Sequence, residues 1–400
     1  MRENRVKKKT GIRFLCMIMI IIKLFCNPYF LLTCRASEVQ TINGMDYVDS
    51  TGNLMEKLEF DQIDNQLQEL FPDYHMNFSE LVKQIISGET KLNINLIIEL
   101  LKQGVGGNAG EAKKIGISIV SLGIVAALFS RFSMIFKNHQ IADISFYFLY
   151  MLFILILLMT FKEAVVIASN TIENIILFMK ILIPTFFMIV GFTTATASAV
   201  VFYQFMFVII TLVESIIAMI ILPATLGFVF LTLMNGLSEE ECLTPLVELI
   251  RKGIEKSLAL IIGFVGGVGF FQSMITPVID SVKAITMQKT VAAIPGIGGV
   301  ADSVTEIVLG SAILIKNSAG LAFVILLLGI CAVPLIHIGL MALALKISAA
   351  MIGIVTDKRM TNCASQVGDG TMLLLRIVAT VMILFIITIA IIIAATNRGM

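Results

Sequence analysis

Residues 373–395 read LLLRIVATVMILFIITIAIIIAA, and this stretch decides the fold class. It carries a single charge, Arg376. A helix needs about 20 apolar residues to cross the roughly 30 Å hydrocarbon core of a bilayer. Inside lipid, every backbone N–H and C=O group must be bonded within the chain, so an apolar stretch of this length is typical of a membrane-spanning helix.

The rest of the chain has the same character. Hydrophobic residues make up 58% of the 400 residues and charged residues 14%, and the mean hydropathy is +0.95. A soluble domain carries about 25% charged residues. A chain with so few charges cannot cover its own surface in water, so we predict an all-α, polytopic membrane protein. The net charge of +1 gives no general attraction to nucleic acid, and we expect none as a partner.

The apolar stretches predict about eight spans. Six single spans are expected at 115–134, 144–161, 175–192, 258–275, 319–345 and 373–395. The tract 199–234 is too long for one crossing, because 36 residues make a helix of about 54 Å. Pro223 or the polar pair Glu214-Ser215 could break it into two crossings. That choice also places more Lys and Arg in the cytoplasmic loops. Seven spans, with one crossing here, are the alternative.

The distribution of charge divides the chain into three regions. Residues 1–36 hold eight basic residues and one acid around an apolar core, which predicts a signal peptide that is cleaved near Ala36. An uncleaved anchor helix is the alternative. Residues 37–110 hold twelve acids and four basic residues and are predicted to lie outside the cytoplasm, because the basic end of the leader stays inside. Residues 111–400 form the multi-pass body.

The outer region is predicted to be a small helical module. Its apolar residues suggest short helices around 54–70, 79–87 and 92–103, and the glycine-rich residues 104–110 suggest a flexible joint into the membrane. The module is either a cap on the membrane body or a docking module for an extracytoplasmic partner. In the body, residues 235–257 begin with acids and place Arg251, Lys252 and Lys256 opposite an apolar face, which is the pattern of an amphipathic helix that lies along the cytoplasmic surface.

Sequence motifs of catalysis and of cofactor binding are missing. The six cysteines form no CxxC pair, the three histidines form no HExxH motif, and no phosphate-binding loop occurs. Residues 296–301 fit a dinucleotide-binding pattern in form, but they lack the strand–helix context and the acid about 20 residues later. We therefore expect neither an enzyme nor a bound metal or cofactor.

Two kinds of residue inside the predicted spans are candidates for function. Gly263 and Gly267 form a GxxxG pattern, which lets helices approach closely either within one subunit or between subunits. Glu214 and Arg376 are charges within apolar tracts, where a charge is costly and faces protein or water. Arg376 could simply extend to the membrane surface. Glu214 is too short to do so, and a role in binding a coupling ion is one alternative.

Residues 276–318 are too long for an ordinary connection and too apolar for a free loop. Asp302 and Glu306 lie one turn apart at the start of a helix predicted at 302–315, which is too short to span. We predict a re-entrant or interfacial hairpin, hinged at the glycines Gly296, Gly298 and Gly299. The hairpin either packs on its own bundle or lines a subunit interface or pore.

The last third of the chain carries a family resemblance. The residues concerned are Pro295-Gly296-Ile297-Gly298-Gly299, ADSVTEIVLGSAILIKNSAG at 301–320, Val333-Pro334-Leu335-Ile336, Asp357-Lys358-Arg359 and Val367-Gly368-Asp369-Gly370. Together they resemble the stage III sporulation protein AE family of endospore-forming bacteria. The resemblance is strongest from 258 to 397 and weaker before 115.

The resemblance implies a component of the transenvelope channel complex between mother cell and forespore, placed in the mother-cell membrane around the forespore. The implied partners are sister proteins of the same operon, a secretion-type ATPase, a forespore protein across the intermembrane space, membrane lipid and further copies of the chain. No catalytic residue is carried over from the family. A stand-alone secondary transporter is the alternative function.

Overall fold

The computed structural model describes residues 64–65, 67–68, 77–87, 94–133, 139–194, 208–237, 242–291, 298–354, 356 and 358–397. The chain falls into two compact units, Met1–Leu54 and Met55–Met400, and all the described residues belong to the second unit. The predicted signal peptide and the cleavage site at Ala36 lie outside the described residues. The same holds for most of the helix predicted around 54–70.

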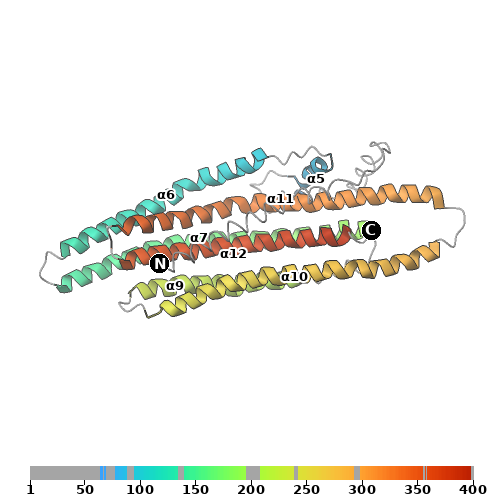
Figure 1. Cartoon of the computed structure of the whole chain (residues 1–400). Coiled ribbons are helices and arrows are strands. Elements are labelled where there is room, and N and C mark those ends of the chain that lie inside the picture. The colour runs from blue at the N-terminus through green and yellow to red at the C-terminus, as the bar shows by residue number, and fades with distance from the viewer. Residues whose placement is uncertain are drawn as a thin grey trace. The chain divides into compact units, whose positions relative to one another are not determined.

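The second unit is a bundle of long helices (Figure 1). The helices are α5 (Phe78–Ile86), α6 (Ile94–Ser133), α7 (His139–Thr194), the π-helical turn η1 (Ile217–Ile221), α9 (Leu222–Leu237), α10 (Thr244–Val291), α11 (Gly298–Ile352) and α12 (Lys358–Asn397). No strand occurs among the described residues, which confirms the predicted all-α class. The short helix predicted at 79–87 is confirmed as α5. The carboxylate of Asp64 accepts hydrogen bonds from the first backbone N–H groups of α5.

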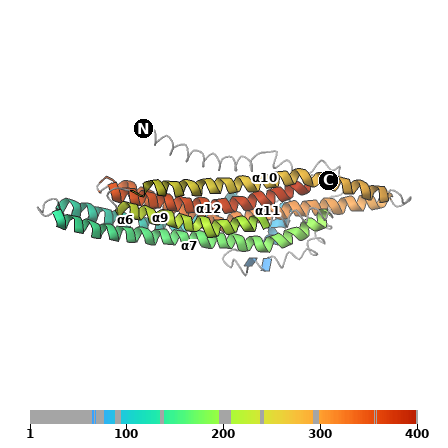
Figure 2. The ribbon, with the colours of Figure 1, turned by 90° about the horizontal axis from the view of Figure 1, so that it is seen from below.

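The C-terminal helix α12 has the most enclosed position in the bundle. It packs against α7, α9, α10 and α11, and both views show it running between α10 and α11 (Figures 1 and 2). From Leu373 to Ile392 its apolar side chains are buried on several sides, and no large hydrophobic residue of its described part is exposed. α7, α10 and α11 each expose several large hydrophobic side chains. These three helices therefore surround α12 and present apolar surface outward.

Four helical stretches are long and apolar enough to cross a membrane: Tyr147–Lys180, Val208–Leu237, Ile313–Ile352 and Lys358–Ile393. The predicted membrane class agrees with this, but the predicted count of eight spans is not confirmed. The spans predicted at 144–161 and 175–192 both lie in α7, which has 56 residues and no break between them. A helix of that length is about 84 Å long, so these two stretches cannot be two antiparallel crossings.

The tract at 199–234 also differs from the prediction. Its described part is one continuous helix, Val208–Leu237, rather than two crossings. The helix widens into the π-helical turn η1 just after Glu214, and Pro223 follows two residues later. A π turn shifts the backbone hydrogen bonds by one residue, so the helix accommodates the missing N–H of proline without ending.

Three other predicted boundaries lie inside helices. α6 runs through the glycine-rich joint predicted at 104–110. α10 joins the C-terminal part of the amphipathic helix predicted at 235–257 to the span predicted at 258–275, so the former is not a separate surface helix. α11 passes through Lys316, where the helix predicted at 302–315 was expected to end. Glycine and proline weaken a helix by only about 1–3 kcal/mol, and packing against neighbours exceeds that cost here.

Buried threonines show how the bundle satisfies polar groups in an apolar interior. Thr171, Thr232 and Thr388 each donate the hydroxyl to the backbone carbonyl four residues earlier, at 2.6–2.8 Å. Thr160, Thr225, Thr371 and Thr380 do the same. A hydroxyl bonded to its own helix can lie in the core without a partner on another helix. The threonines therefore need no water inside the bundle.

Gly236 lies where α9 meets α7 and α12. The hydroxyl of Tyr150 on α7 and the thiol of Cys363 on α12 are 2.7 Å apart and both are buried. A Cβ atom at Gly236 would overlap both the Tyr150 hydroxyl and the Cys363 sulfur. This close approach requires glycine on α9.

We expect Gly236→Ala to destabilise the protein, because the added methyl group displaces a buried hydrogen-bonded pair, at a cost of about 1–3 kcal/mol. Gly227→Ala in the same helix is the matched control, because no described atom lies within 4 Å of its added Cβ atom. Alanine favours a helix over glycine by about 1 kcal/mol, so the control should be neutral or stabilising. Thermal unfolding of both variants in detergent micelles measures the difference, and equal midpoints would contradict the packing described here.

Candidate functional site

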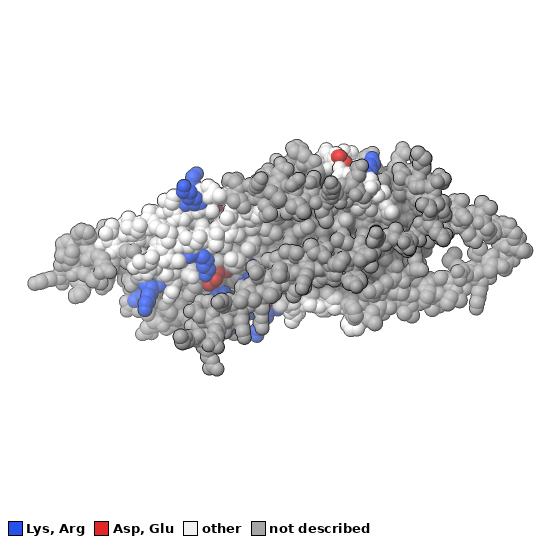
Figure 3. Space-filling view, turned by 45° about the horizontal axis from the view of Figure 1, so that its top comes forward, with Lys and Arg blue, Asp and Glu red and all other residues white. Residues whose placement is uncertain are grey.

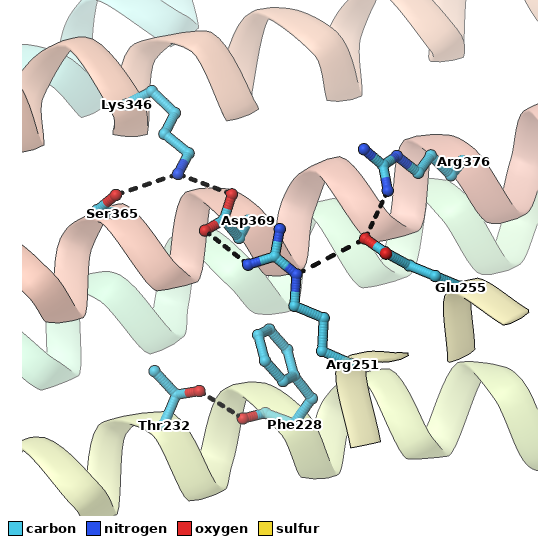
Figure 4. Close-up of polar contacts among 8 residues, drawn as sticks. All are labelled: Phe228, Thr232, Arg251, Glu255, Lys346, Ser365, Asp369 and Arg376. Carbon is cyan, nitrogen blue, oxygen red and sulfur yellow. Dashed lines mark hydrogen bonds and ion pairs between the residues drawn. The ribbon is translucent and has the colours of Figure 1, made fainter. Parts of the chain in front are cut away.

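A network of charged side chains links α10, α11 and α12 (Figure 4). Asp369 of α12 lies at its centre. One carboxylate oxygen of Asp369 is 2.8 Å from Lys346 Nζ of α11, and the other is 3.2 Å from Arg251 Nη1 of α10. Lys346 also donates a hydrogen bond of 3.1 Å to the hydroxyl of Ser365. One carboxylate thus neutralises cations from two other helices.

The network continues along α10 to a second carboxylate. Glu255 lies 3.6 Å from Arg251 Nε, one turn away on the same helix, and accepts a hydrogen bond of 2.6 Å from Arg376 Nη1 of α12. The side chains of these residues are 18–33% exposed, so they are largely but not fully removed from solvent. The set contains three cations and two carboxylates and therefore has one excess positive charge.

The glycines beside Asp369 explain how α12 comes close enough to form the network. A Cβ atom at Gly368 would lie 3.2–3.3 Å from the aliphatic stem of Lys346, and one at Gly370 would overlap Val229 of α9. The Gly-Asp-Gly sequence thus presents a carboxylate between two close helix contacts. Glycine costs about 1 kcal/mol in a helix interior, and the helix tolerates two here because the contacts require them.

A second group of charged residues lies between α6, α7 and α11. Nε2 of His337 on α11 is 3.0 Å from a carboxylate oxygen of Glu111 on α6. This Nε2 atom is buried, and its orientation toward Glu111 is not that of a hydrogen bond. The carboxyl group of Glu163 on α7 lies beside Glu111. Three helices therefore each contribute one titratable side chain.

The two groups lie at the same level of the bundle. A Cβ atom at Gly339, two residues from His337, would be 4.0 Å from Leu375, the neighbour of Arg376. A Cβ atom at Gly370, next to Asp369, would be 3.3 Å from Phe161, two residues from Glu163. Together they form a charged layer across five helices. Elsewhere the surface that Figure 3 describes is mainly uncharged, with a few small groups of Lys, Arg, Asp and Glu.

The predicted charges within spans have different surroundings. Arg376 belongs to the charged layer and pairs with Glu255, so it does not merely extend to the surface. Glu214 is buried, with 5% of its surface exposed. It lies apart from the charged layer, on the N-terminal side of η1 in the helix Val208–Leu237. Glu214 is therefore largely removed from solvent within the subunit, and its role stays a prediction.

The predicted glycine sites do not come together. Gly263 and Gly267 on α10 have no described atom within 4 Å of an added Cβ atom, so this GxxxG pattern makes no close helix contact among the described residues. Gly298, Gly299, Asp302 and Glu306 belong to the first turns of α11, far along that helix from the charged layer. Gly296 lies outside the described residues.

Most of the charged layer was not singled out from the sequence. Asp369 was noted only as part of a family motif, and Glu111, Glu163, Glu255 and Lys346 not at all. Two signals were present: the Arg251–Glu255 spacing of one helical turn, and the acid between two glycines at 368–370. Neither pattern says which helices meet. Among the described residues, no group of three or more His, Cys, Asp or Glu side chains is arranged to hold a metal ion.

The fold and the charged layer define an all-helical membrane protein with ion pairs between its long helices. The model of the family "Stage III sporulation protein AE (spore_III_AE)" matches residues 76–396, and the chain belongs to that family. Stage III sporulation protein AE of Bacillus subtilis (strain 168) is 22% identical over 284 residues, which are 71% of each chain. No solved structure matches. The resemblance drawn from the last third of the sequence is thereby confirmed, and membership supports a role in sporulation.

We expect Asp369→Asn to destabilise the bundle, because it leaves Arg251 and Lys346 without their shared anion. Hydrogen bonds to charged groups contribute about 1.5–3 kcal/mol when buried, so the loss should be about 1–3 kcal/mol at this partial exposure.

Glu248→Gln is the matched control on α10. Its carboxylate is 2.8 Å from Lys252 Nζ, and the hydrogen bond from Lys252 lowers the pKa of Glu248, but both side chains are 60% exposed. Exposed pairs of this kind contribute little to stability, because solvent screens them. Thermal unfolding in detergent compares the two variants. If Glu248→Gln lowers the unfolding midpoint as much as Asp369→Asn does, the charged layer contributes no more to stability than an exposed ion pair.

Proposed function

We propose that the protein is a multi-pass membrane component of a transenvelope, secretion-like channel complex between mother cell and forespore, needed for late forespore gene expression. The observation that carries the proposal is the family match, which covers nearly the whole described bundle. In this proposal the chain lies in the mother-cell membrane that surrounds the forespore. It works with sister proteins of the same operon, a secretion-type ATPase and a forespore protein, and it performs no catalysis itself.

The length of the helices supports a role that extends beyond one bilayer. α7, α10 and α11 have 56, 48 and 55 residues, or about 84, 72 and 82 Å of helix. A bilayer including its headgroups is about 40–45 Å thick. Helices of this length must project from the membrane or be enclosed by protein. In a complex that bridges two membranes, such projections extend into the space between them.

The position of α5 bears on which side the projection lies. Phe78 of α5 stacks on Phe323 of α11, with ring centroids 4.5 Å apart. Phe323 is within the apolar stretch Ile313–Ile352, which has 40 residues, twice what a crossing needs. If α5 belongs to an extracytoplasmic module, the first part of this stretch lies outside the bilayer with it. The remaining residues are still enough for a crossing.

Labelling tests this topology. Gln84 is exposed on α5 and Asn362 is exposed on the first turns of α12. In a background with the native cysteines replaced by serine, we expect Gln84→Cys to react with an impermeant thiol reagent in intact protoplasts of cells that make the protein without having engulfed a forespore. Asn362→Cys, predicted to be cytoplasmic, should react only after lysis. The reverse pattern would overturn the proposed orientation.

The open face of α10 supports assembly of several copies. Among the described residues, no atom lies within 4 Å of a Cβ atom added at Gly263 or Gly267, and Leu260 and Phe264 beside them are 71% and 52% exposed. A ridge of small residues between large apolar ones is suited to close contact with another helix. We therefore propose a homo-oligomer in which this face meets a second subunit and residues 276–318, at the far ends of α10 and α11, line the interface or the pore.

We expect Gly298→Val and Gly299→Val to leave the protein in the membrane but to block sporulation after engulfment, because a side chain at the start of α11 obstructs a contact outside the subunit. Gly253→Val is the control, since an added Cβ atom there meets nothing. Cysteines placed along 302–315 should also cross-link between subunits. Normal sporulation of both variants together with no cross-link would exclude this role for the segment.

A stand-alone secondary transporter is the second candidate. The observation in its favour is the presence of titratable groups inside the bundle, such as Glu214 and His337, which are common in proton-coupled carriers. A transporter should carry solute in proteoliposomes without partners. A channel component should co-purify with the sister proteins from sporulating cells and show no such transport. Transport by the purified chain alone would favour the second candidate.

A further inference from the structure

We propose that a groove between α6 and α11 binds an anionic phospholipid, with hydrocarbon along the groove and the phosphate at Lys113. The proposal goes beyond the function proposed above and rests only on the membrane class of the protein. α6 and α11 pack along each other and run in the same direction (Figure 1). The groove between them has a volume of about 580 Å³, which is within the range of small-molecule sites.

The walls of the groove are apolar and open to the outside. On α6, Ile117 and Ile124 are 58% and 46% exposed. On α11, Leu343, Ile347 and Met351 are 52–53% exposed. Exposed apolar surface that is hollowed in this way is typical of a site for hydrocarbon. The walls are therefore suited to an acyl chain.

The hydroxyl groups in the lining are already bonded to the backbone. Ser121 donates to the carbonyl of Ser118 at 3.0 Å, and Ser348 donates to the carbonyl of Gly116 at 3.4 Å. A hydroxyl bonded in this way needs no water or ligand as a partner. The interior of the groove therefore offers little to a polar solute, and this again favours hydrocarbon.

A positive charge lies at one end of the groove. Among the described lining residues only Lys113 is charged; its side chain is exposed, as is that of the next residue, Lys114. Neither lysine forms an ion pair within the described part of the chain. The carboxylate of Glu111 is not part of the lining and contacts His337 instead. Lysines beside apolar membrane surface attract the headgroups of anionic lipids.

The length of the groove matches one leaflet of a bilayer. Lys113 and Ile124 are 11 residues apart along α6, and Leu340 and Met351 are 11 residues apart along α11. Both distances correspond to about 16 Å of helix. Half of the hydrocarbon core is about 15 Å thick. A lipid whose phosphate lies at Lys113 thus extends its chain along the whole groove.

The size of the groove argues against a helix of a second copy as the occupant. A helix is about 10 Å across, so 16 Å of it fills more than about 1,200 Å³. The groove has about half that volume. A hydrocarbon chain is only about 4–5 Å across, because nonbonded carbon atoms approach to about 4 Å. The groove therefore has room for lipid chains but not for a helix.

Close packing at the floor keeps the two walls in place. The hydroxyl of Thr356 on α11 donates to the carbonyl of Gly123 on α6 at 3.0 Å. A Cβ atom added at Gly123 would overlap Ile352. The groove is thus formed before a ligand enters, which lowers the cost of binding.

Tryptophan fluorescence tests the site, because the chain contains no tryptophan of its own. The full-length protein with Met351→Trp, at the far end of the groove, is placed in phosphatidylcholine vesicles. About one tenth of the lipid is brominated phosphatidylglycerol in one sample and brominated phosphatidylcholine in the other. Bromine quenches a tryptophan that it contacts, and we expect a preference of about fivefold for the anionic lipid. Met151→Trp, at a 63% exposed position on α7, is the matched control and should show no such preference.

Lysine variants test the headgroup contact in the Met351→Trp background. Lys113→Gln should remove most of the preference for phosphatidylglycerol. Lys162→Gln should keep it, because Lys162 is also exposed but lies on α7, outside the groove. Equal quenching by the two lipids in Met351→Trp would overturn the proposal, since lipid then merely surrounds the protein. An equal loss of preference in the two lysine variants would overturn it as well.

Filling the groove tests the contact with the chain. Ala344 lines the groove, whereas Ala350 on the same helix is exposed and does not line it. Native mass spectrometry of the full-length protein in detergent with added phosphatidylglycerol counts the bound lipid. We expect Ala344→Phe and Lys113→Gln each to retain one lipid fewer than the wild type, and Ala350→Phe to retain the same number. A wild-type count in both Ala344→Phe and Lys113→Gln would overturn the proposal.

Discussion

The burial of α12 is the constraint on which the rest of the structure depends. A helix enclosed by α7, α9, α10 and α11 must be apolar on nearly every side, and residues 373–395 meet this requirement. In lipid, such burial gains little from the hydrophobic effect, because lipid tails are as apolar as leucine. Close contacts and polar pairs must hold the helices instead. Gly236, Gly368 and Gly370 provide the close contacts, and Asp369 provides the polar pair at the centre.

The same constraint accounts for the length of the helices. Once α12 is enclosed along some 40 residues, the helices around it gain contacts by running alongside it without interruption. α7 is continuous for 56 residues, through Pro184, and the helix Val208–Leu237 passes Pro223 by means of a π turn. Helix breakers thus change the local hydrogen bonding and do not end the helices. The bundle is accordingly longer than a bilayer is thick.

These features mark the limit of what the sequence could predict. Composition and the apolar stretches predict the all-α membrane class correctly, and the motifs of the last third predict the family. Helix ends were less predictable, because a polar residue such as Lys162 or Lys316 within an apolar run is equally typical of a loop and of a side chain buried by a neighbouring helix. Lys316 is fully buried within α11, although its charge had suggested a position outside the membrane. The sequence pattern of one helix does not show which residues of neighbouring helices pack against it.

The candidate site was harder to predict for the same reason. Each member of the charged layer is unremarkable on its own helix, and only the pairing of α12 with α10 and α11 gives Asp369 its two cations. The layer also divides into two unlike parts. Around α12 it contains ion pairs of Arg and Lys with Asp369 and Glu255, which join α10 and α11 to α12. Around α6 it contains only Glu and His, whose charges depend on protons. The bundle therefore joins α10, α11 and α12 by ion pairs, whereas α6 meets α11 through the contact of Glu111 with His337 and two hydrogen bonds to backbone carbonyls.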